Sequence, residues 1–226
     1  MKLAVLFSGG KDSCYALFKA SKEHDIVCLI SIISKNRESY MFHTPNIELT
    51  KLQAEAIGKP IICKLTEGKK EEELLDLKEA IKEAMYKYNI EGVVTGALAS
   101  FYQLSRIKKI CEELNLICIN PLWEMPQEIL LEELIKNNFR VLIVGIFADF
   151  IDKKLIGKEL DRKILRDLLA LKEKYKINPA GEGGEIETFV IDAPFFNKKI
   201  KIEEVEEKVE ENSAIFIIKK ASLVKK

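Results

Sequence analysis

The stretch that decides the fold lies at the start of the chain: Leu3-Ala4-Val5-Leu6-Phe7-Ser8-Gly9-Gly10-Lys11-Asp12-Ser13. Residues 3–7 are uniformly apolar, which predicts a buried strand, and residues 12–22 continue as an amphipathic helix. Between them, Gly9 and Gly10 reach backbone angles closed to other residues, so successive N–H groups can converge on an anion. The helix adds its positive N-terminal end. The segment therefore predicts a strand–loop–helix unit that binds phosphate groups.

The side chains of this loop suit the same ligand. Lys11 supplies a cation, Ser8 and Ser13 supply hydroxyl donors, and the opposite charge of Asp12 makes sense beside Mg²⁺. A plain strand–turn–helix connection with Asp12 as N-cap explains neither the paired glycines nor the lysine. The patterns GxxxxGK[ST] and GxGxxG do not occur in the chain. We therefore expect pyrophosphate to be bound by Ser8, Gly9, Gly10, Lys11, Asp12 and Ser13, with Asp12 as the metal ligand.

Apolar runs alternate with amphipathic stretches through the first two-thirds of the chain. Strands are predicted at 3–7, 26–33, 60–65, 92–95, 117–120 and 140–145, and helices at 12–22, 48–57, 71–87, 101–114 and 127–136. Fully apolar strands between helices predict a mainly parallel sheet covered on both faces. Right-handed crossovers make this a doubly wound, Rossmann-like α/β fold, with ligands at the carboxyl ends of the strands.

The pattern changes after Pro121, which with Pro126 brackets a predicted turn. Segment 178–185 is too rich in glycine and acidic residues for a regular element. A helix is predicted at 161–174 and extended segments at 188–191, 199–204 and 214–218, while 203–211 also fits a helix face. We expect two domains, 1–124 and 125–226, of which the second is a smaller α+β unit.

Composition narrows the class of protein. The chain has 36 Lys plus Arg against 36 Asp plus Glu, whereas a protein that works on nucleic-acid phosphates is usually basic, so no stable nucleic-acid partner is expected. The five cysteines form no CxxC pair and only two histidines are present, which excludes the usual zinc spacings and predicts buried thiols in a reducing cytosol. Neither an export signal nor a membrane span is visible, so a cytoplasmic protein is expected.

The SGGKDS loop resembles the PP-loop of the N-type ATP pyrophosphatases, enzymes that cleave ATP to AMP and pyrophosphate while adenylating a substrate. Two further stretches make the resemblance specific. They are Gly96-Ala97-Leu98-Ala99-Ser100-Phe101-Tyr102-Gln103, with Arg106 and Pro121-Leu122-Trp123, and Gly181-Glu182-Gly183-Gly184-Glu185-Ile186-Glu187-Thr188. With them the whole chain resembles the diphthine–ammonia ligase family. Ile186 departs from that pattern, where an aromatic residue is common, and this bears on local packing.

The resemblance implies the last step of diphthamide synthesis. The trimethylamino carboxylate on a modified histidine of elongation factor 2 becomes an amide through an adenylated carboxylate, at the expense of ATP and ammonium. The implied catalytic residues are Lys11, Glu185 and Glu187. The nucleotide would also be contacted by Gly96, Ser100, Gln103 and Arg106, of which the last three share a helix face by their spacing. The implied substrate-binding residues are Glu182, Gly183, Gly184, Glu185, Glu187 and Thr188.

From the residues alone, plainer interpretations stay open. The acidic loop also fits a solvated turn, and the face carrying Ser100, Gln103 and Arg106 fits an ordinary polar helix surface. Trp123 fits either a ring stacked on a cation or a core anchor. His43 fits either a site residue or plain surface.

Rival functions also remain. A ligase for a small carboxylic acid would use the same loop chemistry. A tRNA-modifying PP-loop enzyme is disfavoured by the neutral charge and the absence of CxxC, and a non-catalytic nucleotide sensor would not need the second glycine-rich motif. No glutaminase domain is evident, so free ammonium is the expected nitrogen source. The oligomeric state, a homo-oligomer included, is left open.

Overall fold

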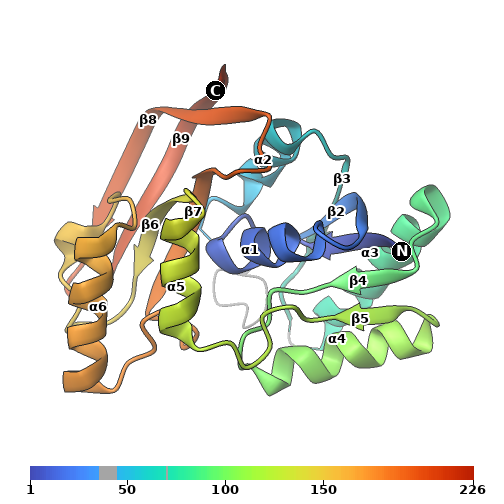
Figure 1. Ribbon diagram of the computed structural model, residues 1–226, viewed down its shortest axis with the longest axis horizontal. Coiled ribbons are helices and arrows are strands. Elements are labelled where there is room, and N and C mark those ends of the chain that lie inside the picture. The colour runs from blue at the N-terminus through green and yellow to red at the C-terminus, as the bar shows by residue number, and fades with distance from the viewer. Residues whose placement is uncertain (36–44, 70) are drawn as a thin grey trace.

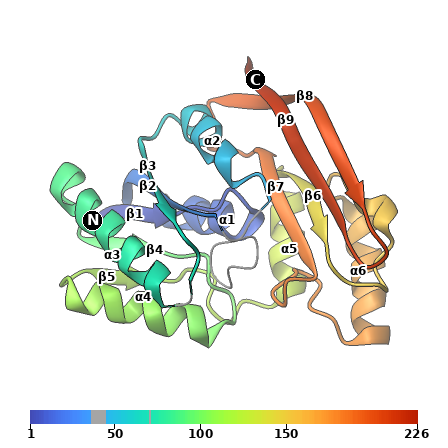
Figure 2. The same cartoon turned by 180° about the vertical axis from the view of Figure 1, so that it is seen from behind.

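The computed structural model describes residues 1–35, 45–69 and 71–226 and combines a parallel sheet with an antiparallel one (Figures 1 and 2). The first sheet has the order β3-β2-β1-β4-β5, and every pairing in it is parallel. Its strands are β1 (Lys2–Leu6), β2 (Asp25–Ser34), β3 (Ile61–Thr66), β4 (Gly92–Val94) and β5 (Ile117–Ile119). The helices that follow these strands are α1 (Lys11–Ala20), α2 (Thr50–Ile57), α3 (Glu72–Tyr88) and α4 (Phe101–Glu113), with a short 3-10 turn at Ile47–Leu49 before α2.

The two faces of the parallel sheet carry different helices. Leu3 and Val5 pack in one cluster with buried residues of α1 and α2. Ala4 points the other way and packs in a second cluster with α3 and α4, represented by Leu77 and Ile110. Alternate residues of a strand face opposite sides of a sheet, so the apolar run at residues 3–6 of β1 is what burial on both faces requires. The predicted doubly wound α/β fold is confirmed.

The second sheet is antiparallel, in the order β7-β6-β9-β8. Its strands are β6 (Arg140–Ile146), β7 (Ile186–Asp192), β8 (Lys198–Val209) and β9 (Ala214–Lys225), accompanied by α5 (Gln127–Lys136), a 3-10 turn at Lys153–Leu155 and α6 (Arg162–Tyr175). This is the expected smaller α+β region. The segment 203–211, which also fitted a helix, is a strand as far as Val209.

One strand prediction is corrected. The strand at 140–145 was grouped with the parallel set, yet β6 pairs antiparallel with β7 and β9. The grouping rested on its unbroken apolar composition, and six of its seven residues are buried. A central antiparallel strand covered on both faces has the same composition as a parallel one, so composition alone does not separate the two.

The two sheets share one core. The larger cluster of buried residues includes Val5 and Leu17 from the first region, and Leu130, Val144 and Phe189 from the second. The division into domains 1–124 and 125–226 therefore stays a prediction about sequence organisation, because buried apolar side chains of the two parts form one continuous cluster. None of the helices in the described ranges combines the length and apolarity that a bilayer-spanning segment needs.

Candidate active site

The SGGKDS loop joins β1 to α1 at the carboxyl end of the parallel sheet, and its own hydroxyl groups hold its shape. Ser13 Oγ accepts a hydrogen bond from Ser8 N at 3.3 Å and donates one to Gly10 O at 3.2 Å. Gly9 has φ +78°, in the left-handed region that suits glycine. A Cβ there would also lie 2.1 Å from Gln53 Oε1. The loop therefore has the geometry expected of an anion nest.

Lys11 and Asp12 form an ion pair at the start of α1. Lys11 Nζ lies 3.0 Å from Asp12 Oδ2, and the side chain of Lys11 is only 5% exposed. The other carboxylate oxygen, Asp12 Oδ1, is buried, and no described residue gives it a hydrogen bond. Buried carboxylate oxygens normally have a partner. Asp12 Oδ1 is therefore available to bind one more group, such as a metal ion.

Gln53 is a functional-site residue that the sequence analysis missed. It is fully buried on α2, and its Nε2 donates to Gly9 O at 2.9 Å and to Val190 O at 2.8 Å. Val190 N also donates to Gly9 O, at 3.0 Å. Gln53 thus fastens the glycine loop to β7 of the second sheet. An amide among the apolar residues of the predicted helix 48–57 was the available signal, because a buried amide needs polar partners.

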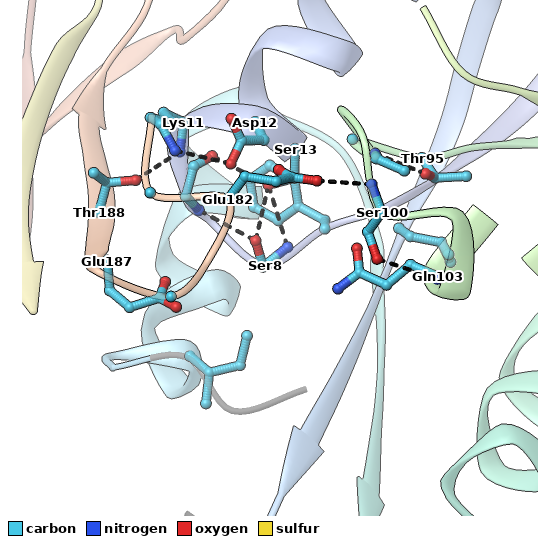
Figure 3. A pocket seen from close by; sticks show the side chains of 18 of the residues that line it. Ser8, Lys11, Asp12, Ser13, Thr95, Ser100, Gln103, Glu182, Glu187 and Thr188 are labelled. Atoms are coloured by element: carbon cyan, nitrogen blue, oxygen red, sulfur yellow. Dashed lines mark hydrogen bonds and ion pairs between the residues drawn. The ribbon is translucent and has the colours of Figure 1, made fainter. Parts of the chain in front are cut away.

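The second motif lies directly against the first. Lys11 N donates to Thr188 Oγ1 at 3.1 Å, and a Cβ on Gly10 would lie 3.2 Å from Thr188 O. Thr188 is itself buried at the start of β7. Figure 3 shows Thr188 beside Lys11, with Glu182 on the other side of the glycine loop. Residues 177 positions apart therefore form a single site.

The two motifs line one cavity of about 940 Å³. Its polar lining includes Ser8, Lys11, Asp12, Ser13, Thr95, Ser100, Gln103, Glu182, Glu187 and Thr188. Its apolar lining near the ends of β1 and β2 includes Leu6, Ile30, Ile32, Leu77 and Ile107. A cavity of this size accommodates a nucleotide together with a second substrate.

Glu182 anchors the acidic loop to the first region. Its Oε1 accepts hydrogen bonds from Ala99 N at 2.9 Å and Ser100 N at 3.0 Å. Burial raises the pKa of Glu182 above its ordinary value, and these two N–H groups partly oppose that shift. Glu182 lines the cavity, as expected for a site residue, but one of its oxygens is already occupied by backbone groups.

Glu185 and Glu187 lie in different surroundings although only one residue separates them. Glu185 turns back on its own loop, where it accepts hydrogen bonds from Gly183 N at 3.0 Å and Asn178 N at 3.3 Å. The structure does not bring it into the cavity lining.

Glu187 is directed from β7 into the cavity (Figure 3). No described residue gives it a hydrogen bond or ion pair. Burial raises the pKa of Glu187 to about 7, an effect that Lys11 reduces and Asp12 reinforces.

Of the predicted nucleotide contacts Gly96, Ser100, Gln103 and Arg106, only the first three line the cavity. Gly96 lines the cavity, and a Cβ there would lie 2.9 Å from Ser13 N, so glycine permits close packing on the loop. Ser100 caps α4 by accepting from Gln103 N at 3.4 Å, and both residues line the cavity. Arg106 instead binds Glu71 at 2.7 Å and lies 3.5 Å over the ring of Tyr102. The cavity lining does not include it.

The remaining predicted residues are placed as follows. Gly183 and Gly184 line the cavity, but Trp123, in the turn before α5, does not. His43 falls outside the described residues. All five cysteines are free, three of them buried. Within the described ranges, no three His, Cys, Asp or Glu side chains are grouped to hold a metal ion, so Asp12 would need oxygen ligands from a substrate as its companions.

Comparison with known proteins identifies the family. Residues 1–117 match the diphthamide synthase N-terminal domain and residues 126–224 match the diphthamide synthase C-terminal domain. Diphthine--ammonia ligase from Mus musculus is 37% identical over 91% of this chain and 84% of its own length, and that from Bos taurus is 36% identical with the same coverage.

A solved structure of a predicted subunit of tRNA methyltransferase from Methanocaldococcus jannaschii overlaps with a TM-score of 0.42 at 18% identity, over 86% of this chain and 98% of that chain. That likeness is too low to carry an argument. Both family domains and the curated relatives cover nearly all of the sequence, and the chain therefore belongs to the diphthamide synthase family of ATP-dependent ligases.

Proposed function

We propose that this chain converts diphthine on elongation factor 2 to diphthamide, using ATP and ammonium and releasing AMP and pyrophosphate. The observation that carries this proposal is the meeting of the two motifs at one cavity. The glycine loop supplies an anion site, and β7 supplies a carboxylate beside it. An enzyme that joins a nucleotide to a second, cationic substrate needs both features in contact.

The glycine loop would bind the phosphates of ATP. Its N–H groups, the N-terminus of α1 and Lys11 Nζ all favour negative charge at this point. These groups matter most when charge develops on the departing pyrophosphate. The unpartnered Asp12 Oδ1 fits Mg²⁺, which proteins bind through one or two carboxylates plus substrate phosphates. When bound, Mg²⁺ would neutralise part of the pyrophosphate charge.

The apolar part of the cavity would hold the adenine. Leu6, Ile30 and Ile32 lie near the carboxyl ends of β1 and β2, and Leu77 of α3 completes this wall. An aromatic base gains free energy by burying its faces against such side chains. Adenine on this side and pyrophosphate on the glycine loop leave the α-phosphorus between them, facing β7.

Two steps then follow. An oxygen of the substrate carboxylate attacks the α-phosphorus and pyrophosphate leaves, which produces an acyl adenylate. The nitrogen of ammonia attacks the acyl carbon, AMP leaves, and the nitrogen releases one proton to solvent to give the neutral amide. Ammonium must first lose a proton, and we assign its acceptance to Glu187, because a pKa of about 7 allows that carboxylate to take up a proton near neutral pH. We assign Glu185 the role of ordering the loop, since its oxygens are held by loop N–H groups.

The proposal is tested with elongation factor 2 that carries diphthine. The factor is incubated with this protein, ATP, Mg²⁺ and ammonium, and mass spectrometry follows the exchange of a carboxyl oxygen for an amide nitrogen. Chromatography of the nucleotides should show AMP and pyrophosphate in equal amounts. ADP and inorganic phosphate as the main products, or an unchanged factor, would refute the proposed reaction. Reactions without ammonium and with Lys11→Ala serve as controls.

A further inference from the structure

One aromatic ring in the cavity has no role in the mechanism above. Phe147 follows β6, and its backbone N donates to Glu185 O at 2.9 Å, which ties this position to the acidic loop. Its ring lines the cavity and is 37% exposed. No other ring among the described residues stacks on it. Phe150, three residues later and equally exposed, instead stacks on Tyr175 at 5.0 Å, outside the cavity lining.

The sheet places this ring beside Glu187. Gly145 of β6 pairs with Glu187 on one side and with Ile215 of β9 on the other. Gly145 has no side chain, and a Cβ built there would lie 2.7 Å from Phe147 Cε2 and 2.9 Å from Glu187 Cβ. The ring edge and the carboxylate arm therefore flank the same point, and Ile215 also lines the cavity there. The result is an apolar, aromatic wall that carries the Glu187 carboxylate.

This chemistry selects a particular kind of cation. A quaternary ammonium group has no N–H to donate, so it gains nothing from a ring of hydrogen-bond acceptors. It is held by aromatic faces, apolar contacts and a nearby negative charge. A primary ammonium group loses its hydration in the same place and finds too few acceptors to replace it. The wall formed by Phe147, Ile215 and Glu187 suits the quaternary group.

We propose that Phe147, with Glu187 beside it, forms the subsite for the trimethylammonium group of diphthine and sets the preference for the fully methylated substrate. The inference rests on the proposed function, in which diphthine is the substrate. Diphthine carries its trimethylammonium group next to the reacting carboxylate. A subsite one residue from Thr188, which contacts the glycine loop, therefore places the carboxylate on the side of the cavity where the α-phosphorus would lie.

The test compares two substrates and four proteins. Elongation factor 2 carrying either the trimethylated side chain or its unmethylated amino counterpart is amidated by the wild type, Phe147→Leu, Phe147→Tyr and Phe150→Leu. We expect Phe147→Leu to lower kcat/KM for the trimethylated factor by about tenfold, mainly through KM, because a desolvated cation–π contact contributes on that scale. The same variant should change kcat/KM for the unmethylated factor by less than about threefold. Phe147→Tyr should retain the preference, since it retains a ring.

The outcomes separate the two proposals. Equal losses on both factors, or a preference that survives Phe147→Leu, would overturn the subsite while leaving the proposed function standing. A wild type that amidates neither factor would overturn both. Phe150→Leu removes an equally exposed ring that does not line the cavity, and should leave the preference unchanged. ATP affinity by calorimetry and the Tm of each variant identify any change in folding.

Discussion

The two glycine-rich segments of the cavity differ in how much of their shape their own residues hold. The SGGKDS loop closes on itself, because Ser13 Oγ bonds both Ser8 N and Gly10 O within six residues. The segment from Gly181 to Thr188 depends on partners far away in the sequence. Glu182 is bonded to N–H groups of residues 99 and 100, and Thr188 to Lys11. The first segment can be recognised locally, whereas the second gains its meaning only from the fold that surrounds it.

The same contrast recurs between two carboxylates of the second segment. Glu185 is satisfied by its own loop, while Glu187 faces the cavity with no hydrogen-bond partner among the described residues. Residue type and spacing do not distinguish them. We infer that a charge left unsatisfied by its neighbours is the one available for chemistry.

Removing the cation of the first loop should have the largest effect. In Lys11→Ala, turnover should fall by 10²-fold or more, about 2.7 kcal/mol of barrier, because the lysine stabilises charge that develops on pyrophosphate. The rate of AMP formation measures this. Lys19→Ala, in the last turn of the same helix, is the matched control. A folded Lys11→Ala protein with the wild-type rate would show that Lys11 has no role in catalysis.

Replacing Glu187 or Glu185 by glutamine should lower the rate of amide formation to very different extents. Glu187→Gln should lower amide formation by about 10²-fold, since a positioned base contributes on that scale, while ATP affinity measured by calorimetry stays the same. Glu185→Gln keeps an oxygen acceptor for only one of the two loop N–H groups, but Glu185 does not line the cavity, so amide formation should fall by less than about threefold. Equal losses in the two variants would show that the contrast between Glu185 and Glu187 has no functional meaning.

Removing the hydrogen bonds by which Gln53 links the glycine loop to β7 should lower the free energy of unfolding and weaken ATP binding. Gln53→Leu leaves the carbonyl groups of Gly9 and Val190 with one donor fewer in a buried site. We expect the free energy of unfolding to fall by about 2 kcal/mol, and the KM for ATP to rise several-fold because Gly9 is less well held. Urea denaturation measures the first and steady-state kinetics the second. Lys51→Leu, on the exposed face of the same helix, should change neither.

The smallest effect concerns pH and the Glu187 carboxylate. The folded-state pKa of Glu187 lies at about 7, above its ordinary value, so the folded protein holds a proton that the unfolded chain has already released. Stability from this group is full below the unfolded pKa and is lost as pH rises to about 7. Glu187→Gln should therefore have a Tm a few degrees above that of the wild type at pH 8 and equal to it at pH 4. A Glu187→Gln protein less stable than the wild type at pH 8 would contradict a buried Glu187 that has no hydrogen-bond partner among the described residues.

Much of the fold could be predicted from the sequence, and particular residues show why. The parallel strands were recognisable because each is apolar and lies between helices. The strand containing Val144 was assigned to that sheet because burial on both faces leaves the same pattern in either sheet type. Arg106 shares its spacing with Ser100 and Gln103, yet it pairs with Glu71 across the helix layer. Phe147 belongs to no motif, and the one local signal for Gln53 is an amide among the apolar residues of its helix, which does not say what the amide holds.

The sequence by itself determined the glycine loop and the parallel α/β unit, because both depend on short-range effects: backbone freedom at Gly9, hydroxyl groups within six residues, and apolar periodicity. Only the tertiary structure decided which carboxylate faces the cavity, which amide holds the loop, and which ring lies beside Glu187. The positions of Glu187 and the ring follow from strand pairing between β6, β7 and β9, which aligns Glu187, Gly145 and Ile215 across the sheet, and that of the amide follows from the packing of α2 against the glycine loop and β7. Long-range register follows from how the whole core packs, so no local pattern encodes it.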